Sequence, residues 1–300
     1  MKREYALAGV SVLFWGTAAP VSKLVLSGMP ELMLMFFGTG LSFLSLLAVN
    51  LGRIRRGNLR RRGARDYAGM AALGFLGLFL YNFLYYRGIV RLTSVEACIV
   101  NYMWPVLVVV FSIPVLKERL TLPKAAGIAV SFVGLLLIAT QGSLSGFAGT
   151  DLQGLACSFL GAVCYGLFCV LSKRADYDAA QLMCVSYLVC SLCSGVLCAA
   201  SGQLRFPTGG QWLGILWMAL LVDALSYVCW CTALNRGDTA RVSNLAYFAP
   251  FLSVVFGKLL LDETVTVWSL GGLALIISGV LVQAVKIRRS APMNAQQRMD

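Results

Sequence analysis

The residue of this 300-residue chain that says most about its chemistry is Asp223, a carboxylate within an otherwise apolar stretch. Ser226, Tyr227 and Trp230 follow it at the three- and four-residue spacing of one helix face. A charged side chain in the middle of a membrane-spanning segment costs about 2.5–3.5 kcal/mol, so it usually faces water, a partner or a substrate. We therefore expect Asp223 to bind a substrate ammonium group or to carry a proton; the alternative is a structural hydrogen bond to a neighbouring helix.

A second stripe of polar and aromatic residues lies 145 residues earlier in the chain. Tyr81, Asn82 and Tyr85 stand at the positions equivalent to the serine, tyrosine and tryptophan that follow Asp223. Positions that face lipid are expected to carry Leu, Ile, Val or Phe, so both stripes are predicted to line a cavity. The alternative is a belt of aromatic residues at the membrane interface, but both stripes lie well inside their apolar runs.

Two prolines stand at equivalent places in the two halves of the chain. Pro105 and Pro250 each follow a tyrosine by three residues, Tyr102 and Tyr247. Proline cannot donate to the hydrogen-bond ladder of a helix, so it bends the helix and leaves one carbonyl free. We predict that these two helices are kinked and mobile, with both tyrosines near the membrane midplane.

Asn101 and Trp104 lie on the same face as the first of these prolines. The amide of Asn101 offers both a donor and an acceptor, which suits an amino-acid backbone. Aromatic walls suit a flat or apolar side chain through stacking and cation–π contact. Glu96 is a second candidate for proton coupling, and an ion pair with Arg87 or Arg91 is its structural alternative.

These residues require helices that cross a membrane to position them. Hydrophobic residues make up 59% of the chain and charged residues 13%, with a mean hydropathy of +0.78. A soluble domain carries about 25% charged residues. The apolar runs lack the two-residue alternation of a barrel, so we predict an all-α integral membrane protein. Its ten expected transmembrane helices cover residues 5–26, 31–51, 67–87, 93–116, 122–141, 152–172, 179–200, 211–234, 239–261 and 267–285.

The two halves of the sequence match each other in register. The matching pairs are Trp15 with Tyr165, Gly16 with Gly166, Ser22 with Ser172 and Lys23 with Lys173 at a shift of 150, and Tyr102 with Tyr247, Pro105 with Pro250, Leu107 with Leu252, Glu118 with Glu263, Gly127 with Gly272 and Gly134 with Gly279 at a shift of 145. A repeat of five helices is odd, so the second must enter the membrane from the opposite side. Inverted repeats of this kind are typical of secondary transporters that work by alternating access. A duplication without transport is the structural alternative.

The expected boundaries are residues 1–141 for the first repeat, 142–150 for a Gly/Ser-rich linker, 151–286 for the second repeat and 287–300 for a polar tail. The distribution of basic residues predicts that both termini lie in the cytoplasm, because 20 of the 25 Lys and Arg then lie inside. The five left outside are Lys23, Arg87, Arg91, Arg205 and Lys258.

Other functions lack the residues that they need. The chain has ten cysteines but no histidine, so neither a metal site nor a cofactor is expected, and the cysteines are assigned to helix packing. No nucleophile motif, second mid-membrane aspartate or nucleotide-binding motif is found, which argues against an enzyme or an ATP-driven pump. The net charge of +12 is attributed to cytoplasmic loops and not to nucleic-acid binding.

The five-plus-five plan, the paired Tyr-x-x-Pro segments and the acidic Glu118 and Glu263 resemble the EamA family of the drug/metabolite transporter superfamily. Glu96 and the segment from Val100 to Pro105 are similar to the fourth-helix segment of bacterial aromatic-amino-acid exporters in that superfamily. The resemblance covers residues 5 to 285 and implies export from the cytoplasm through a central cavity lined by helices 1, 3, 4, 6, 8 and 9. A channel stays a less favoured alternative.

The expected partners are a small-molecule substrate and membrane lipid, in the cytoplasmic (inner) membrane. Amino acids, possibly aromatic ones, are the predicted substrates, with other metabolites or drugs as the alternative. A pathway completed within one chain needs no second copy, so the oligomeric state stays open and a monomer suffices. The predicted substrate-binding residues are Trp15, Tyr81, Asn82, Tyr85, Asn101, Tyr102, Trp104, Tyr165, Asp223, Tyr227, Trp230 and Tyr247, with Asp223 and Glu96 for proton coupling and Pro105 and Pro250 for kinks.

Overall fold

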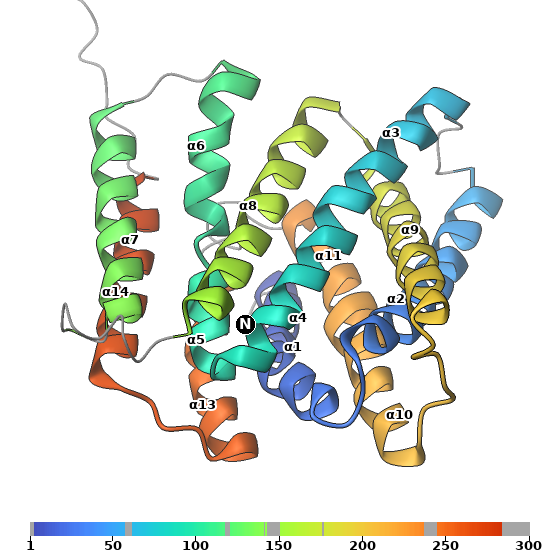
Figure 1. Ribbon diagram of the computed structural model, residues 1–300. Coiled ribbons are helices and arrows are strands. Elements are labelled where there is room, and N and C mark those ends of the chain that lie inside the picture. The colour runs from blue at the N-terminus through green and yellow to red at the C-terminus, as the bar shows by residue number, and fades with distance from the viewer. Residues whose placement is uncertain are drawn as a thin grey trace, which may run out of the picture.

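The structure is a computed structural model that describes residues 3–57, 62–117, 121–140, 142, 151–175, 177–236 and 245–283. Helices make up nearly all of these residues, and no strand occurs among them (Figure 1). The helical segments of the first half are α1 (Arg3–Leu26), α2 (Glu31–Arg55), α3 (Ala64–Gly74), the π-helical η1 (Phe75–Leu80), α4 (Tyr81–Arg91), α5 (Ser94–Asn101), α6 (Trp104–Leu116) and α7 (Leu122–Thr140).

The second half repeats this order, although residues 237–244, between α11 and η4, lie outside the described part of the chain. Its helical segments are α8 (Leu152–Ala175), α9 (Ala179–Ala200), α10 (Gly209–Leu216), the π-helical η3 (Trp217–Leu225), α11 (Ser226–Arg236), the 3-10 turn η4 (Leu245–Phe248), α13 (Ala249–Leu261) and α14 (Val267–Gln283).

Seven helical stretches in the described part of the chain are long and apolar enough to cross a membrane. Three of them join neighbouring segments, namely Ala64–Arg91, Ser94–Leu116 and Gly209–Trp230. Three shorter apolar helices, Ala125–Leu137, Ala249–Leu261 and Val267–Val282, accompany them. All ten ranges expected from the sequence therefore contain helix, and seven of the resulting stretches meet the length and composition of a membrane span.

Several elements have the same bounds in the two halves at a shift of 145 residues. α4 and α11 correspond from end to end, and so do α6 and α13. Both π-helical segments end immediately before the first of these pairs, at Leu80 and Leu225. Both members of the second pair end in a left-handed residue, Lys117 with φ 55° and Asp262 with φ 51°. Local breaks in the helices thus recur at equivalent positions.

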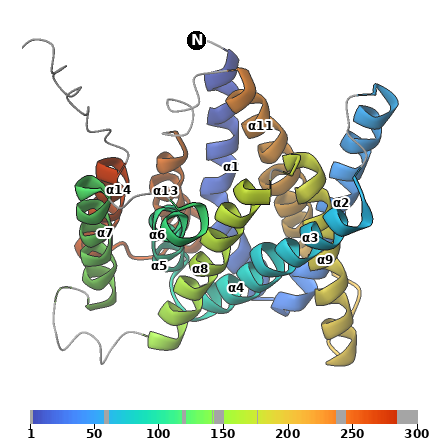
Figure 2. The same ribbon diagram turned by 90° about the horizontal axis from the view of Figure 1, so that it is seen from above.

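The packing of the helices is also shared by the two halves. α1 packs against α11 and α13, and their counterparts α8, α4 and α6 pack in the same way. α2 lies against α9, and α7 lies against α14 as a pair at one side of the molecule (Figure 2). The counterparts α6 and α13 run in opposite directions, because α6 ends at the upper edge of Figure 1 and α13 at the lower edge.

Two glycines at equivalent positions of the halves allow close contacts of α1 with α13 and of α8 with α6. A Cβ on Gly16 of α1 would lie 2.4 Å from the Cβ of Leu252 in α13, and one on Gly166 of α8 would lie 3.1 Å from the Cβ of Leu107 in α6. Small residues let transmembrane helices approach to backbone contact. A glycine therefore permits close packing both between α1 and α13 and between α8 and α6.

The structure differs from the expected continuous helix over residues 93–116. Helix α5 ends at Asn101 and α6 begins at Trp104, so Pro105 stands in the first turn of a new helix. Pro250 stands at the same place in α13, after a 3-10 turn. Proline is tolerated in a first turn because its missing N–H has no helical acceptor there. The chain thus departs from α-helical geometry just before each proline, and the helix does not bend at the proline itself.

Two of the expected boundaries fall largely outside the described residues. Only Gly142 is described of the linker over 142–150, and the tail over 287–300 is not described at all. Both therefore stay predictions from the sequence.

Candidate functional site

The predicted aromatic residues of α4, α6 and α8 form one cluster. The ring of Tyr165 in α8 lies 5.0 Å from that of Tyr81 in α4 and 5.3 Å from that of Trp104 in α6, measured between centroids. Tyr81 also stacks on Tyr85 at 5.8 Å, with only 7° between the two planes. Such offset and edge contacts are the preferred aromatic arrangements. The structure thus brings together four residues that lie up to 84 positions apart in the sequence.

Asn101 adds an amide to this cluster at the C-terminal end of α5. Its Nδ2 donates to the hydroxyl of Tyr81 at 3.2 Å, and the residue is 6% exposed. Its Oδ1 is buried and accepts no hydrogen bond from the described residues. Most buried polar atoms in proteins have a hydrogen-bond partner. The Oδ1 of Asn101 therefore keeps an acceptor capacity that none of the described residues uses.

Asp223 lies in η3 and is held from two other helices. Ser42 Oγ in α2 lies 2.8 Å from Asp223 Oδ2, and the hydroxyl of Tyr187 in α9 is a hydrogen-bonding neighbour of the same carboxylate. Its electrostatic neighbours include Tyr81 and Tyr86 of α4. The carboxylate therefore lies between the α2–α9 pair and the tyrosines of α4.

The predicted common face of Asp223, Ser226, Tyr227 and Trp230 is kept only in part, because Asp223 and Tyr227 both adjoin Tyr187 of α9. The ring of Trp230 lies 4.9 Å from that of Trp15 in α1, with 57° between the planes. Asp223 contacts α2 and α9 instead. The π-helical segment supplies the reason, because its wider turn rotates the carboxylate away from the face that an α-helix would give it.

The other predicted residues take up several environments. Asn82 faces α9, where its side chain is a hydrogen-bonding neighbour of Cys190. Tyr227 lies near Tyr187, and Tyr102 lies near Tyr85 in the break between α5 and α6. The tyrosine at position 247 belongs to η4, and its side chain, like that of the proline at 105, lies outside the described part.

Glu96 has a local role in the structure. It forms a capping box with Thr93 at the N-terminus of α5, in which Thr93 Oγ1 accepts from the backbone of Glu96 and Glu96 Oε2 accepts from that of Thr93. The two arginines offered as its alternative partners have partners of their own. Arg87 pairs with Glu31 and Arg91 with Asp151.

Two residues beside Asp223 are not singled out by the sequence. Ser42 stands four residues after Gly38, a spacing of small residues that is typical of helix packing, and Tyr187 lies in a long apolar run with no polar periodicity. Both residues are identified as part of the site only from the structure, by their contact with Asp223. A tyrosine in an apolar run is equally well explained by packing.

A separate apolar groove between α1 and α13 contains none of the predicted site residues. Its lining side chains carry no polar group, and two of them, Leu13 and Phe248, are 43% and 59% exposed. A surface of this kind suits lipid tails. The groove is lined by Gly9, Val12, Leu13, Leu245, Phe248, Phe251 and Leu252.

Known proteins of similar sequence are transporters by name. An aromatic amino acid exporter, YddG, from Ancylobacter novellus is 28% identical over 221 residues, which are 72% of this chain and 76% of the relative. A probable terminal-alkyne amino-acid exporter from Streptantibioticus cattleyicolor is 27% identical over 289 residues, 94% of this chain and 93% of the relative.

The fold and the family model agree with these relatives. A solved crystal structure with 23% sequence identity superposes with a TM-score of 0.68 over 94% of this chain and 95% of its own. The model of the EamA-like transporter family matches residues 2–140 and 152–284. Because these two segments take in most of both halves, the chain belongs to the EamA-like transporter family.

Proposed function

We propose that this chain is a secondary transporter that exports amino acids, or small metabolites related to them, across the cytoplasmic membrane by alternating access. The observation that carries the proposal is the free Oδ1 of Asn101 beside the stacked rings of Tyr81 and Tyr85. An acceptor against aromatic walls suits a small molecule with an N–H donor and a flat or apolar side chain. Two relatives named as exporters of aromatic or alkyne amino acids support this class of substrate.

The proposed architecture is ten membrane crossings in two inverted repeats. The matching bounds of α4 with α11 and of α6 with α13 support it, as do the two segments of the family match. The opposite directions of α6 and α13 in Figure 1 agree with an inverted second repeat. In transporters of this kind the substrate site lies near the repeat interface, at the middle of the membrane. The aromatic cluster is built from α4 and α6 of the first half and α8 of the second half, and so fits that place.

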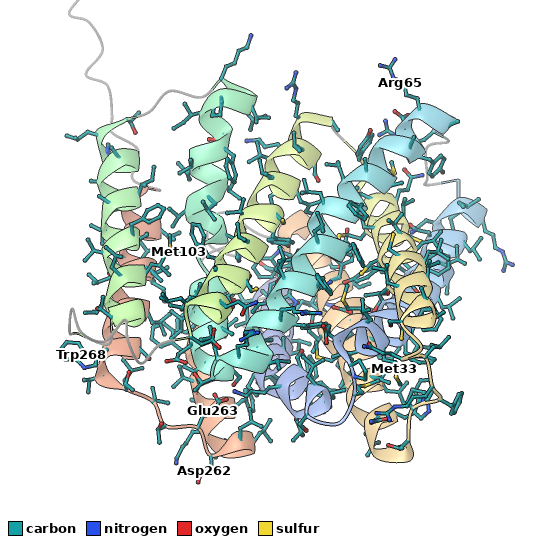
Figure 3. All side chains as sticks on the ribbon, in the orientation of Figure 1. Met33, Arg65, Met103, Asp262, Glu263 and Trp268 are labelled. Atoms are coloured by element: carbon teal, nitrogen blue, oxygen red, sulfur yellow. The ribbon has the colours of Figure 1, made fainter. Side chains whose placement is uncertain are left out.

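The proposed orientation places both termini in the cytoplasm. Arg65 belongs to the basic segment after α2 and lies at the upper edge of Figure 3, whereas Asp262 and Glu263 lie at the lower edge. By the positive-inside rule the upper edge is cytoplasmic and the lower edge is outside. Export, as in the names of the two relatives, then runs from the upper edge to the lower one.

Asp223 has two proposed roles that the geometry keeps open. It can bind the substrate ammonium group, or it can carry the proton whose downhill flow drives export. Ser42 Oγ lies 2.8 Å from the carboxylate and 2.9 Å from the carbonyl of Gly38. The hydroxyl has one hydrogen and can accept as well as donate. It therefore donates to an ionised Asp223, or accepts from a protonated one while it donates to Gly38.

Uptake of radiolabelled amino acids into proteoliposomes, with and without an imposed pH gradient, tests the proposal. Saturable uptake of Phe, Tyr, Trp or Thr is the expected result. Loss of gradient-driven uptake in Asp223→Asn, with substrate binding kept, assigns the proton to Asp223; weaker binding with the gradient response kept assigns the ammonium. Asp262→Asn makes the same charge change at an exposed left-handed position that asparagine tolerates, and serves as the matched control.

The competing functions give different results in the same assay. A flux that does not saturate and shows no counter-transport identifies a channel. Saturable transport of other metabolites, with none of any amino acid, keeps the carrier and overturns the amino-acid class.

A further inference from the structure

A buried carboxylate joins three helices at the lower edge of the molecule in Figure 3. Glu263 follows the left-handed end of α13, and its side chain is 7% exposed. Its Oε1 accepts from the backbone N–H of Ser94 at 2.8 Å. Its Oε2 accepts from Ser94 Oγ at 2.8 Å and from the N–H of Val95 at 3.2 Å. The carboxylate thus satisfies the free N–H groups at the start of α5, where a negative charge is favourable.

Lys23 completes this contact from the end of α1. Its Nζ lies 3.2 Å from Glu263 Oε1, and it also donates to the carbonyl of Leu92 in the turn between α4 and α5. The ammonium therefore ties α1 to the turn before α5 as well as to the carboxylate. Loss of either charge would leave the other without its ionic partner in a mostly buried place.

The contact shares α5 with the aromatic cluster and lies about two turns nearer this edge of the molecule than the predicted site residues on α1 and α5. On α1, Lys23 follows Trp15 by eight residues, and on α5 Ser94 precedes Asn101 by seven. These spacings correspond to about 10–12 Å along a helix. Cys98 lies on α5 between the contact and the site, is 5% exposed, and has Tyr85 and Ser253 as side-chain neighbours. Cys98 therefore lies between the contact and Asn101 along α5.

The contact joins α1 and α13 to the start of α5. α1 packs against α13, whereas α5 packs against α8 as well as against α13 and α1. Glu263 and Lys23 come from the α1–α13 pair, and the residues that they hold, Ser94, Val95 and Leu92, belong to α5 and the turn before it. A movement of the start of α5 away from α1 and α13 must break these hydrogen bonds. The sequence also carries both charged residues in its other half, as Lys173 and Glu118.

We propose that Lys23 and Glu263 form a latch that holds the transport pathway closed at its outer end. The latch rests on the proposed function, because alternating access requires one end to be closed while the other is open. It is made when Glu263 caps α5 and Lys23 holds Leu92, and it is broken when the pathway opens to the outside. The neighbouring pair of Lys258 and Asp262, with side chains 58% and 89% exposed, takes no part in it.

The rate at which the native Cys98 thiol is modified measures whether the latch is closed, so no cysteine has to be introduced. The full-length protein in proteoliposomes is treated from the predicted outer side with a membrane-impermeant methanethiosulfonate, and the rate of modification of Cys98 is followed by peptide mass spectrometry. We expect slow modification in the wild type and at least tenfold faster modification in Lys23→Gln and Glu263→Gln. Lys23→Arg keeps the charge and should stay close to the wild type, and Cys98→Ala confirms the modified peptide.

Lys258→Gln is the matched control, because it removes one positive charge from the same end and breaks only the exposed pair. Equal rates in Lys23→Gln, Lys258→Gln and the wild type would overturn the latch, as would fast modification of the wild type. If Glu263→Gln does not fold, Lys23→Gln alone decides the outcome. In Lys23→Gln, Glu263 keeps its hydrogen bonds to Ser94 and Val95. Faster modification only from the opposite side overturns the outer placement. The readout needs no substrate, so it stands apart from the test of amino-acid transport.

Discussion

Ser42 and Asp223 lie 2.8 Å apart, hydroxyl oxygen to carboxylate oxygen, although 181 residues separate them in the chain. The same hydroxyl lies 2.9 Å from the carbonyl of Gly38, one turn earlier in α2. A single hydrogen therefore serves two acceptors, and the protonation of Asp223 decides which of them receives it. The hydrogen bond that Ser42 of α2 donates therefore depends on the charge of Asp223 in η3.

Ser42→Ala should slow transport without removing its dependence on the pH gradient. The carboxylate loses one donor, and a hydrogen bond to a charged group contributes about 1.5–3 kcal/mol, so we expect a rate lower by about tenfold or more. Ser45→Ala is the control, because Ser45 donates to the carbonyl of Leu41 at 2.9 Å in the same local pattern. Initial rates in proteoliposomes measure the effect, and equal rates in both variants would show that the contact with Asp223 is only structural.

Asn101→Ala should raise the KM of uptake, because the free Oδ1 is the proposed acceptor for the substrate. Loss of one hydrogen bond corresponds to about a tenfold rise in KM. Tyr81→Phe removes only the hydroxyl that accepts a hydrogen bond from Asn101 Nδ2, so KM is expected to rise by about two- to threefold. If Tyr81→Phe raises KM as much as Asn101→Ala does, the amide serves to hold the tyrosine and does not bind substrate.

Gly16→Ala should destabilise the protein more than Gly166→Ala. The added Cβ would lie 2.4 Å from Leu252 Cβ in the first case and 3.1 Å from Leu107 Cβ in the second. Overpacking costs about 1–3 kcal/mol, and we expect the two variants near the upper and lower ends of that range. Gly9→Ala on α1 is the control, since no atom lies within 4 Å of its Cβ. Unfolding of the detergent-solubilised protein measures the differences, and an equal loss in all three variants would contradict the interlocking.

Asp178→Asn should lower stability at neutral pH but not in acid. Asp178 caps α9 and forms two hydrogen bonds of 2.9 Å with Arg53, and this pairing holds the pKa of the carboxyl below its usual range. Its contribution is therefore present above the unfolded pKa of about 4 and is lost as the pH falls through the lower folded pKa. Both side chains are about one-third exposed, so solvent screening limits the loss to about 1 kcal/mol.

Stability of the wild type and of Asp178→Asn measured between pH 7 and the acid range checks this expectation. The two curves should converge as the pH falls. A difference that persists unchanged in acid would show that the loss of stability does not come from the charge of Asp178. Arg53→Gln should reproduce the loss at neutral pH.

The positions of the helices could be predicted from the sequence because lipid imposes a length of about 20 apolar residues on each crossing. The ranges around Glu31, Ala179 and Val267 begin where the structure begins them. The breaks were harder to place. Pro105 and Pro250 marked the right regions, yet the helices end before them, since a proline signals either a kink or a first turn and the sequence does not separate the two.

The candidate site was predictable as a set of residue types and not as a set of contacts. Tyr81, Tyr85, Trp104 and Tyr165 meet in one cluster, and their lining of a cavity stays a prediction. Asp223 turns toward α2 and α9, because a π-helical segment changes the face of a residue without any sequence pattern that marks it. The partners of that carboxylate depend on packing between distant helices, which one sequence cannot supply.

The close approaches at Gly16 and Gly166 divide the molecule into parts that can and cannot shift. Helices locked at backbone contact cannot slide past each other without collision, since packed interiors switch between discrete arrangements and do not deform continuously. α1 with α13 and α6 with α8 therefore each travel as one rigid body. In the alternating-access cycle proposed above, we expect these two bodies to rock against each other, with α5, which packs against α1, α13 and α8, at the boundary between them.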